Sequence, residues 1–126
     1  MRILSVLFLL LLLSPAVRAA DYAYFDFEPD IITNYIGSGT KLGYVRLSIS
    51  LQTATQADQE LLKKHEPLLR SALLSYFGDQ PEERIKAVPA RDELRLECLE
   101  LVNNMLEREG NAKVVTDLLF TKYLFE

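Results

Sequence analysis

The sequence has few of the residues that build most catalytic and metal sites. Its 126 residues include one cysteine (Cys98), one histidine (His65) and no tryptophan. A single cysteine excludes an internal disulfide and a multi-cysteine metal site. The sequence also contains no serine–histidine–aspartate arrangement, metal-ligand spacing or phosphate-binding loop. We therefore predict no catalytic, cofactor-binding or metal-binding residues.

Positive charge is in the minority. Lys and Arg number 14 against 18 Asp and Glu, which gives a net charge of −4. Binding to nucleic acid needs clustered Lys and Arg, and the sequence has no such cluster. The composition is 49% hydrophobic and 25% charged, as in folded domains. We therefore expect one folded domain that does not bind nucleic acid.

Long apolar runs are missing except at the N-terminus. Residues 1–20 read MRILSVLFLLLLLSPAVRAA, with Arg2 before the apolar run 3–13 and small residues around Ala19. A transmembrane helix needs about 20 apolar residues, whereas a basic start, a short apolar core and a small-residue cleavage site are typical of a secretory signal peptide. We predict that residues 1–19 are a signal peptide cleaved after Ala19, or otherwise a short membrane anchor. Residues 20–126 are then one exported domain, periplasmic in a Gram-negative bacterium.

Residues 43–53 alternate between apolar and polar side chains, which predicts a strand with one face of each kind. We expect the apolar face to lie beneath two helices, and the polar face to be a candidate contact surface. Residues 21–27 predict a first strand or extended arm, and residues 31–36 an antiparallel hairpin partner across a turn at 37–40. The apolar set in 43–53 is Val45, Leu47, Ile49 and Leu51, and the polar set is Tyr44, Arg46, Ser48, Ser50 and Gln52.

Two later segments have the apolar spacing of helices. Residues 55–79 offer Thr55 as N-cap and Gly78 as C-cap, and Pro67 predicts a kink or a division into two pieces. Residues 91–110 predict a second helix. Its inner stripe is Leu94, Cys98, Leu101, Val102 and Met105, and its outward residues are Arg95, Glu100, Asn103, Glu107 and Arg108.

The remaining segments complete an α+β pattern. Residues 84–88, within the polar connection 79–89, predict a short strand or a tether. Residues 112–126 predict a last strand that is apolar on both faces, which indicates a central place in the sheet or a second face against another molecule. The order of elements predicts an antiparallel or mixed sheet with two long helices packed on one face.

The residues that could still carry chemistry have simpler interpretations. His65 could be a base or a ligand, but no second histidine or cysteine pair supports it. Cys98 falls on the inner helical stripe, where an unpaired cysteine behaves as a small hydrophobic residue. A reactive thiol needs a basic or helix-terminal setting instead. The paired carboxylates of the second helix lie on its solvent-facing side, and exposure to solvent accounts for their presence there.

Four segments in register resemble the periplasmic domain of the FliL family of flagellar basal body-associated proteins. The resemblance implies a stomatin (SPFH)-like fold and a non-enzymatic protein near the inner membrane. It implies a homo-oligomeric ring, assembly around MotA/MotB-type stator units, and support of rotation in swimming or swarming. Structural ion pairing is what we expect of the residues on pattern positions, Asn34, Arg46, Arg70, Arg95 and Asn103. The four segments are EPDIITNYIGSGTKLGYVRLSISL (28–51), HEPLLRSALLSYFGDQPEE (65–83), RDELRLECLELVNNMLE (91–107) and VVTDLLFTKYLFE (114–126).

Two other interpretations remain open. Members of this family usually carry a full transmembrane helix before the domain, and here the apolar run is short. One alternative is therefore a soluble periplasmic oligomerising or binding module of the same fold, not tied to motility. Another is a small hydrolase or ligand-binding enzyme that uses His65 or Cys98. Self-association is expected at the last strand and at the aromatic arm 21–27.

Overall fold

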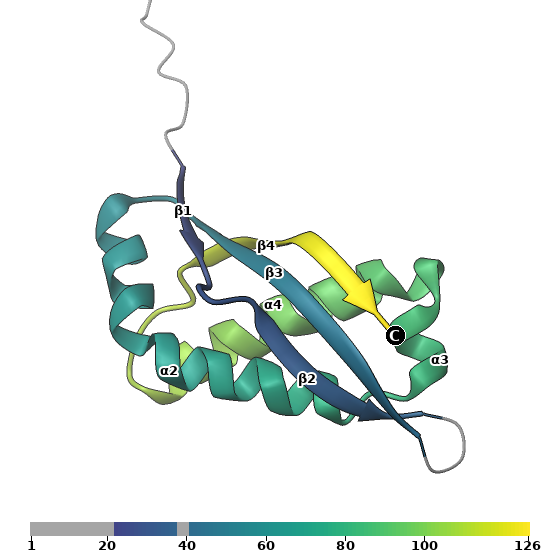
Figure 1. Cartoon of the computed structure of the whole chain (residues 1–126). Helices are drawn as coiled ribbons and strands as arrows, with labels where there is room; N and C mark the ends of the chain where they lie inside the picture. The colour runs from purple at the N-terminus through teal and green to yellow at the C-terminus, as the bar shows by residue number, and fades with distance from the viewer. Residues whose placement is uncertain (1–21, 38–40) are drawn as a thin grey trace, which may run out of the picture.

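The computed structural model describes residues 22–37 and 41–126 (Figure 1). The predicted signal peptide and the centre of the predicted turn at 37–40 lie outside the described residues. The elements in chain order are β1 (Ala23–Asp26), β2 (Ile31–Ile36), β3 (Leu42–Thr53), α2 (Gln56–Gly78), α3 (Glu82–Lys86), the 3₁₀ helix η1 (Val88–Ala90), α4 (Arg91–Arg108) and β4 (Val115–Phe125).

Strand β3 is the centre of the sheet. It pairs with β1 and β2 in succession along one side and with β4 along the other, always antiparallel. The predicted hairpin of residues 31–36 with the long strand is therefore confirmed. The helices α2 and α4 both lie on one face of this sheet, and no helix of the described residues covers the opposite face (Figure 1). The predicted α+β class, with an antiparallel sheet and helices packed against it, is confirmed.

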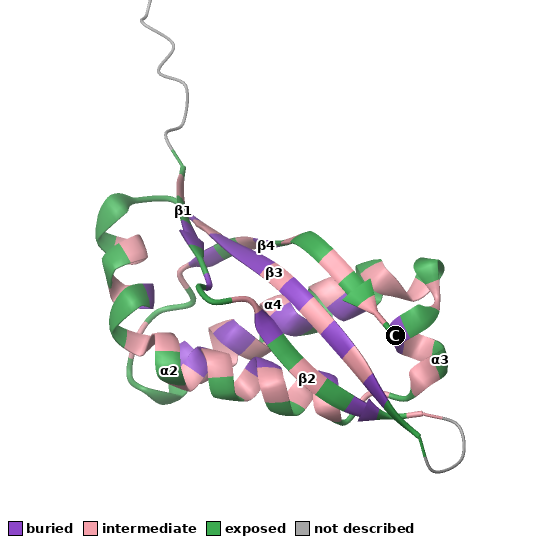
Figure 2. Cartoon of the chain, in the orientation of Figure 1, coloured by how far each residue is buried: buried purple, intermediate pink, exposed green. Residues whose placement is uncertain are grey.

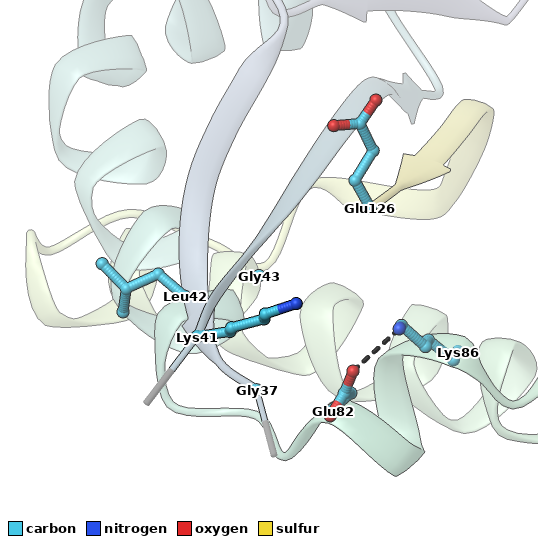
Figure 3. Close-up of a pocket in the computed structure, with 7 residues that line it drawn as sticks. All are labelled: Gly37, Lys41, Leu42, Gly43, Glu82, Lys86 and Glu126. Atoms are coloured by element: carbon cyan, nitrogen blue, oxygen red, sulfur yellow. Dashed lines mark hydrogen bonds and ion pairs between the residues drawn. The ribbon is translucent and has the colours of Figure 1, made fainter. Parts of the chain in front are cut away.

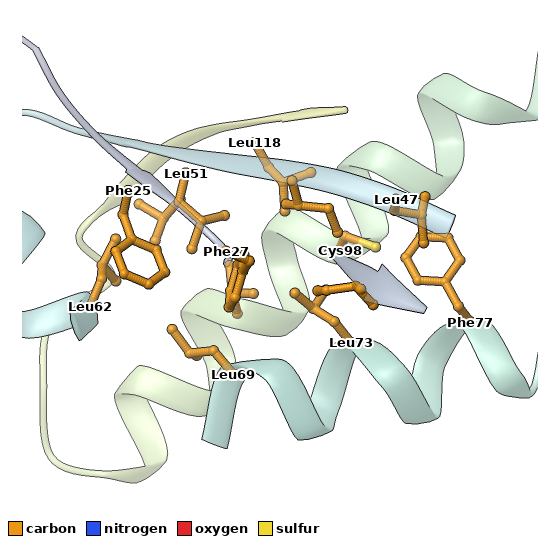
Figure 4. Packing of buried hydrophobic residues seen from close by; sticks show 14 of the residues in the cluster. Phe25, Phe27, Leu47, Leu51, Leu62, Leu69, Leu73, Phe77, Cys98 and Leu118 are labelled. Carbon is orange, nitrogen blue, oxygen red and sulfur yellow. The ribbon is translucent and has the colours of Figure 1, made fainter. Parts of the chain in front are cut away.

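The alternation along β3 positions the core between the sheet and the helices. All four predicted apolar side chains of this strand are at most 1% exposed, and the burial alternates along the ribbon in Figure 2. Figure 4 shows the strand side chains meeting those of α2 and α4. The buried apolar residues are Phe25, Phe27, Ile31, Tyr35, Val45, Leu47, Ile49, Leu51, Val115 and Leu118 on strand-side segments, and Leu62, Leu69, Leu73, Phe77, Ile85, Leu94, Cys98, Val102 and Leu106 on helices.

Helix α2 begins as predicted and ends differently. The Thr55 side chain accepts a hydrogen bond from the Asp58 backbone N–H at 3.1 Å, which confirms the N-cap. Pro67 lies inside one assigned helix, so the segment is not divided into two. The prediction of Gly78 as C-cap is wrong, because Gly78 is the last helical residue. The C-cap is Asp79, whose backbone has right-handed helical dihedral angles and whose N–H donates to the Ser75 carbonyl. No helix in the described part of the chain is both long and apolar enough to cross a bilayer.

The connection after α2 is helical, and neither predicted alternative, a strand or a tether, is correct. Helix α3 has acidic residues in its first turn and basic residues in its last, an arrangement that favours a helix through its dipole. Ile85, the fourth of its five residues, is fully buried in the core. The hydroxyl of Tyr123 on β4 donates to the Ile85 carbonyl at 2.7 Å and so ties this short helix to the sheet.

Strand β4 lies at an edge of the sheet, so the prediction that it is central is wrong. Among the described strands it pairs with β3 alone. Its second set of apolar side chains points to the uncovered face of the sheet, where Leu119 is 38% and Leu124 53% exposed. Apolar residues on both faces therefore reflect one covered face and one exposed apolar face.

Candidate interaction surface

The surroundings of His65 and Cys98 suit a structural role for both residues. The Nδ1 atom of His65 lies 3.1 Å from the backbone oxygen of Leu61, and its Nε2 atom lies 3.3 Å from Nδ2 of Asn111, so both ring nitrogens have partners. Cys98 is 0% exposed, and burial raises the pKa of its thiol. A protonated, inaccessible thiol is a poor nucleophile. Within residues 22–37 and 41–126, no cluster of three or more His, Cys, Asp or Glu could hold a metal ion.

A carboxylate of α4 that could have been an acid–base group is part of an ion-pair cluster. The Oε2 atom of Glu97 lies 2.8 Å from Nη1 of Arg84 and also accepts a hydrogen bond from the Tyr76 hydroxyl. The hydrogen bond from Arg84, and then that from Tyr76, hold the pKa of Glu97 below its ordinary value. A general acid at neutral pH needs a raised pKa instead. The cluster thus joins α2, α3 and α4 and has a structural role.

The hollow beside the β2–β3 turn is small for a ligand site. Its volume is about 180 Å³, whereas ligand pockets commonly span roughly 300–1,000 Å³. Two of its charged side chains, Glu82 and Lys86, form an ion pair at 2.7 Å (Figure 3). The complete lining is Gly37, Lys41, Leu42, Gly43, Glu82, Lys86 and Glu126.

The uncovered face of the sheet is the most distinctive surface of the molecule. Even-numbered residues of β3 point to this face, away from the helices, and the strand register places residues of β2 and β4 beside them. One row across the sheet, for example, consists of Ile32, Arg46 and Leu124. Of the predicted polar set, Ser50 is nearly buried at 5% exposure, while the other four are half-buried. The predicted polar residues of β3 therefore lie on the uncovered face, and this face is less polar than expected.

An ion-pair cluster occupies the middle of this face. Asp30 accepts a hydrogen bond from Ser48 Oγ at 2.6 Å and one from Arg46 Nε at 2.8 Å, and Lys122 Nζ lies 3.7 Å away. The bonds from Ser48 and Arg46, with the positive charge of Lys122, hold the pKa of Asp30 below its ordinary value. This cluster joins the residue that precedes β2 to side chains of β3 and β4.

Exposed apolar side chains flank the charged cluster. Ile32 is 46% and Leu124 53% exposed on one side of it, and Leu119 is 38% exposed on the other. Exposed apolar groups around a fixed polar cluster are common at protein interfaces, because the apolar area supplies affinity and the polar groups fix register. This face therefore combines exposed apolar area with a fixed polar cluster.

Arg70 fixes the corner between β1 and β2 from the helical side. Its Nη2 donates to the Pro29 carbonyl at 2.9 Å, and its Nε pairs with Glu66 at 2.6 Å. The guanidinium also lies 5.7 Å from the centre of the Phe27 ring. The corner that carries Asp30 is therefore positioned by α2. The structural role predicted for Arg46 and Arg70 is confirmed.

Arg95 and Asn103 do not face outward, contrary to the prediction. Arg95 Nη1 lies 2.8 Å from Asp117 Oδ1 on β4. Asn103 Nδ2 donates to the Val115 carbonyl at 3.0 Å, and Val115 N–H donates back to Asn103 Oδ1 at 3.1 Å. Both side chains attach α4 to the start of β4. Helical periodicity places them next to the apolar stripe, and the position of β4 gives them the partners that turn them inward.

Asp30, Ile32 and Lys122 are members of this face that the sequence analysis did not identify. Asp30 lies between the predicted strands 21–27 and 31–36, and Ile32 lies within the second of them. The alternation of residues 31–36 could have placed Ile32 with Asn34 and Ile36 on one face, and all three are exposed. No local signal pairs Asp30 with Lys122, because the contact depends on the register of β4 against β3.

Comparison with known proteins gives the chain a family. The model of the flagellar basal body-associated protein FliL family matches residues 24–125. The flagellar protein FliL of Aquifex aeolicus (strain VF5) is 26% identical over 102 residues, which cover 81% of this chain and 60% of that relative. The chain thus spans about 60% of the length of the curated relative it matches. Since the family model matches nearly all of the described domain, this chain belongs to the FliL family of flagellar basal body-associated proteins.

Proposed function

We propose that this protein is a non-enzymatic accessory scaffold of the bacterial flagellar motor. On this proposal it works in the periplasm, at or near the inner membrane, where it associates with MotA/MotB-type stator units and supports rotation during swimming or swarming. Family membership carries the proposal. The uncovered sheet face gives it a physical basis, because a scaffold needs a rigid surface with exposed apolar groups. We also expect the fold to be similar to the stomatin domain.

The stator-binding surface in this proposal is the row of Ile32, Arg46 and Leu124 with the neighbouring Asp30 cluster. The two apolar residues are about half exposed and lie on paired strands, so their positions are fixed by backbone hydrogen bonds. Arg46 lies between them and is held by Asp30 at 2.8 Å. A preorganised surface of this kind loses little conformational entropy on binding.

Self-association is part of the same proposal and uses the apolar side of β4. Leu119 and Leu124 are exposed there, and the arm 21–27 exposes Tyr22 at 51% and Tyr24 at 45%. Phe25 and Phe27 of that arm are buried in the core at 8% and 2% exposure, and residues 23–26 pair with β3. A ring would require a heterologous interface that closes by rotation.

The test compares two exposed leucines in cells. Leu124→Glu places a charge on the proposed contact surface, and Leu96→Glu places one on α4, where Leu96 is 49% exposed. We expect Leu124→Glu to lower stator occupancy under high load and to reduce swarming, and we expect deletion of the gene to do the same. Leu96→Glu should leave both unchanged, since it carries the same chemical change on the helical side.

Pull-down from membranes with the purified protein provides the direct measurement. Stator proteins should be retained by the unaltered chain and by Leu96→Glu, and lost with Leu124→Glu. If deletion leaves swimming speed, swarming and stator occupancy unchanged, the motor role is wrong. The soluble periplasmic binding module, which the short apolar run 3–13 favours, would then be the better interpretation.

A further inference from the structure

A groove runs between strand β4 and the start of helix α4, at the edge of the sheet. Its volume is about 400 Å³, within the range of roughly 300–1,000 Å³ found for binding sites. Phe120 and Tyr123 contribute aromatic surface, and Val88, which is 67% exposed, contributes aliphatic surface. The remaining lining residues are Arg91, Asp92, Arg95 and Leu119.

Arg91 is the cation of the groove that has no counter-charge. Arg95 pairs with Asp92 at 2.9 Å and with Asp117 at 2.8 Å, so the carboxylate of Asp92 in the lining is held in an ion pair with Arg95 and not with Arg91. Arg91 forms no ion pair with any described residue, and its Nε is buried without an acceptor. Its guanidinium instead lies 4.4 Å from the centre of the Tyr123 ring. This stacking holds a guanidinium without an ion-pair partner among the described residues at a fixed place beside an apolar surface.

The edge of β4 next to the groove has free backbone groups. Tyr44 and Glu126 exchange both backbone hydrogen bonds, at 3.2 and 2.9 Å. In an antiparallel pair, the backbone N–H and C=O groups of successive residues point alternately toward the partner strand and away from it. The backbone N–H and C=O groups of Tyr123 and Phe125 therefore point away from β3, and no described strand lies on that side of β4. An extended segment can therefore add to β4 as a further strand, as in other cases of β-strand addition.

From these three observations we propose that the groove binds an extended acidic segment of a partner protein. The segment adds as a strand along the edge of β4. One Asp or Glu side chain of it pairs with Arg91, and an apolar side chain two residues away lies over Phe120 and Val88. The spacing follows from the strand, because residues two apart point to the same face. This site shares Leu119 with the uncovered sheet face but includes no residue of the proposed stator-binding row, so its failure would leave the proposed stator binding standing.

The test uses a matched pair of synthetic peptides and the purified full chain. Both are short, blocked at each end and built of alternating valine and threonine. One carries a central glutamate, and the other carries glutamine at that place. Backbone amide shifts in NMR titrations report where and how tightly each binds. We expect shifts at Tyr123 and Phe125, and the glutamate peptide to bind about tenfold more tightly, the usual effect of one charge-assisted hydrogen bond.

Three variants show whether Arg91 causes this preference. Arg91→Gln should abolish the preference for glutamate, and Arg91→Lys should keep part of it if the charge is what matters. Arg46→Gln, which removes an arginine from the other surface, should keep it in full. The proposal is overturned if the glutamate peptide does not bind, if the two peptides bind equally, or if the shifts fall on the uncovered face. It is also overturned if sedimentation shows self-association that Arg91→Glu dissolves, because a second copy would then occupy the groove.

Discussion

Replacing Gly43 with alanine should strongly destabilise this domain. The buried ring of Tyr35, 1% exposed, crosses the backbone of β3 at Gly43, and its hydroxyl donates to the carbonyl of Glu126, the residue after β4, at 2.8 Å. A Cβ atom at position 43 would lie 2.1 Å from two ring carbons of Tyr35. The ring would have to move by roughly 1 Å or more to reach ordinary contact at 3.4 Å. This one ring connects β2, β3 and β4, so its displacement should affect the whole sheet.

The magnitude follows from three contributions. Overpacking of a core costs about 1–3 kcal/mol, and losing the Tyr35 hydrogen bond costs about 1 kcal/mol more. The lower entropy of an alanine-containing unfolded chain offsets about 0.5 kcal/mol. We therefore expect Gly43→Ala to lower the free energy of unfolding by about 2–3 kcal/mol. For a domain of this size the melting temperature should fall by roughly 10–20 °C.

Urea unfolding monitored by circular dichroism measures this change. Gly78→Ala is the matched control, because a Cβ there would meet its nearest atoms at 3.7 Å. That control should be neutral or stabilise by up to about 1 kcal/mol, since alanine is the better helix residue. In a Tyr35→Leu background Gly43→Ala should cost much less, because the blocking ring is gone. A Gly43→Ala protein as stable as the unaltered one would refute the reasoning.

Three further predictions concern other parts of the molecule. Asn103→Ala should cost about 2–3 kcal/mol in urea unfolding, because the N–H and C=O of Val115 both lose their partner; Asn103→Asp, which keeps the acceptor, should cost less, and equal costs would contradict this. The pKa of Asp30 is depressed below its ordinary value of 3.8, so its stabilising contribution is present above that pH and lost as pH falls through the folded value. Asp30→Asn should therefore flatten the dependence of the urea midpoint on pH below about 4, and an unchanged slope would disprove the role of the cluster. Cys98 should react with a thiol reagent at pH 8 only after unfolding, because it is fully buried with a raised pKa; rapid labelling of the native protein would contradict this.

Several features of the fold could be predicted from sequence because they depend on short-range order. Alternation along β3 gave its covered face, since side chains on a strand point in turn to opposite sides. Spacings of three and four residues gave the helices and the burial of Cys98. The Thr55 cap was predictable because its partner is three residues away. The absence of catalytic motifs and the family resemblance also came from the residues alone.

Other features were beyond local patterns because they join residues far apart in the chain. The edge position of β4 was mispredicted, since apolar residues on both faces of a strand occur in a central strand and in an edge strand with an exposed apolar face. The inward contacts of Arg95 and Asn103 arise only once β4 lies beside α4. The 82–86 segment became a helix where a strand or tether was expected, because Ile85 could be buried against the core while the flanking charges stayed in solvent.

The amino-acid sequence by itself determined the types of the two long helices and of the strands, the covered face of β3, the burial of Cys98 and the family. Periodicity and capping are encoded within a few residues, and hydrophobic burial follows directly from them. Only the tertiary structure decided which surfaces are left for partners. The Asp30 cluster, the exposed row around Arg46 and the groove at Arg91 each combine residues from strands and helices that are distant in sequence. Their positions depend on strand register and helix packing, which no single segment specifies.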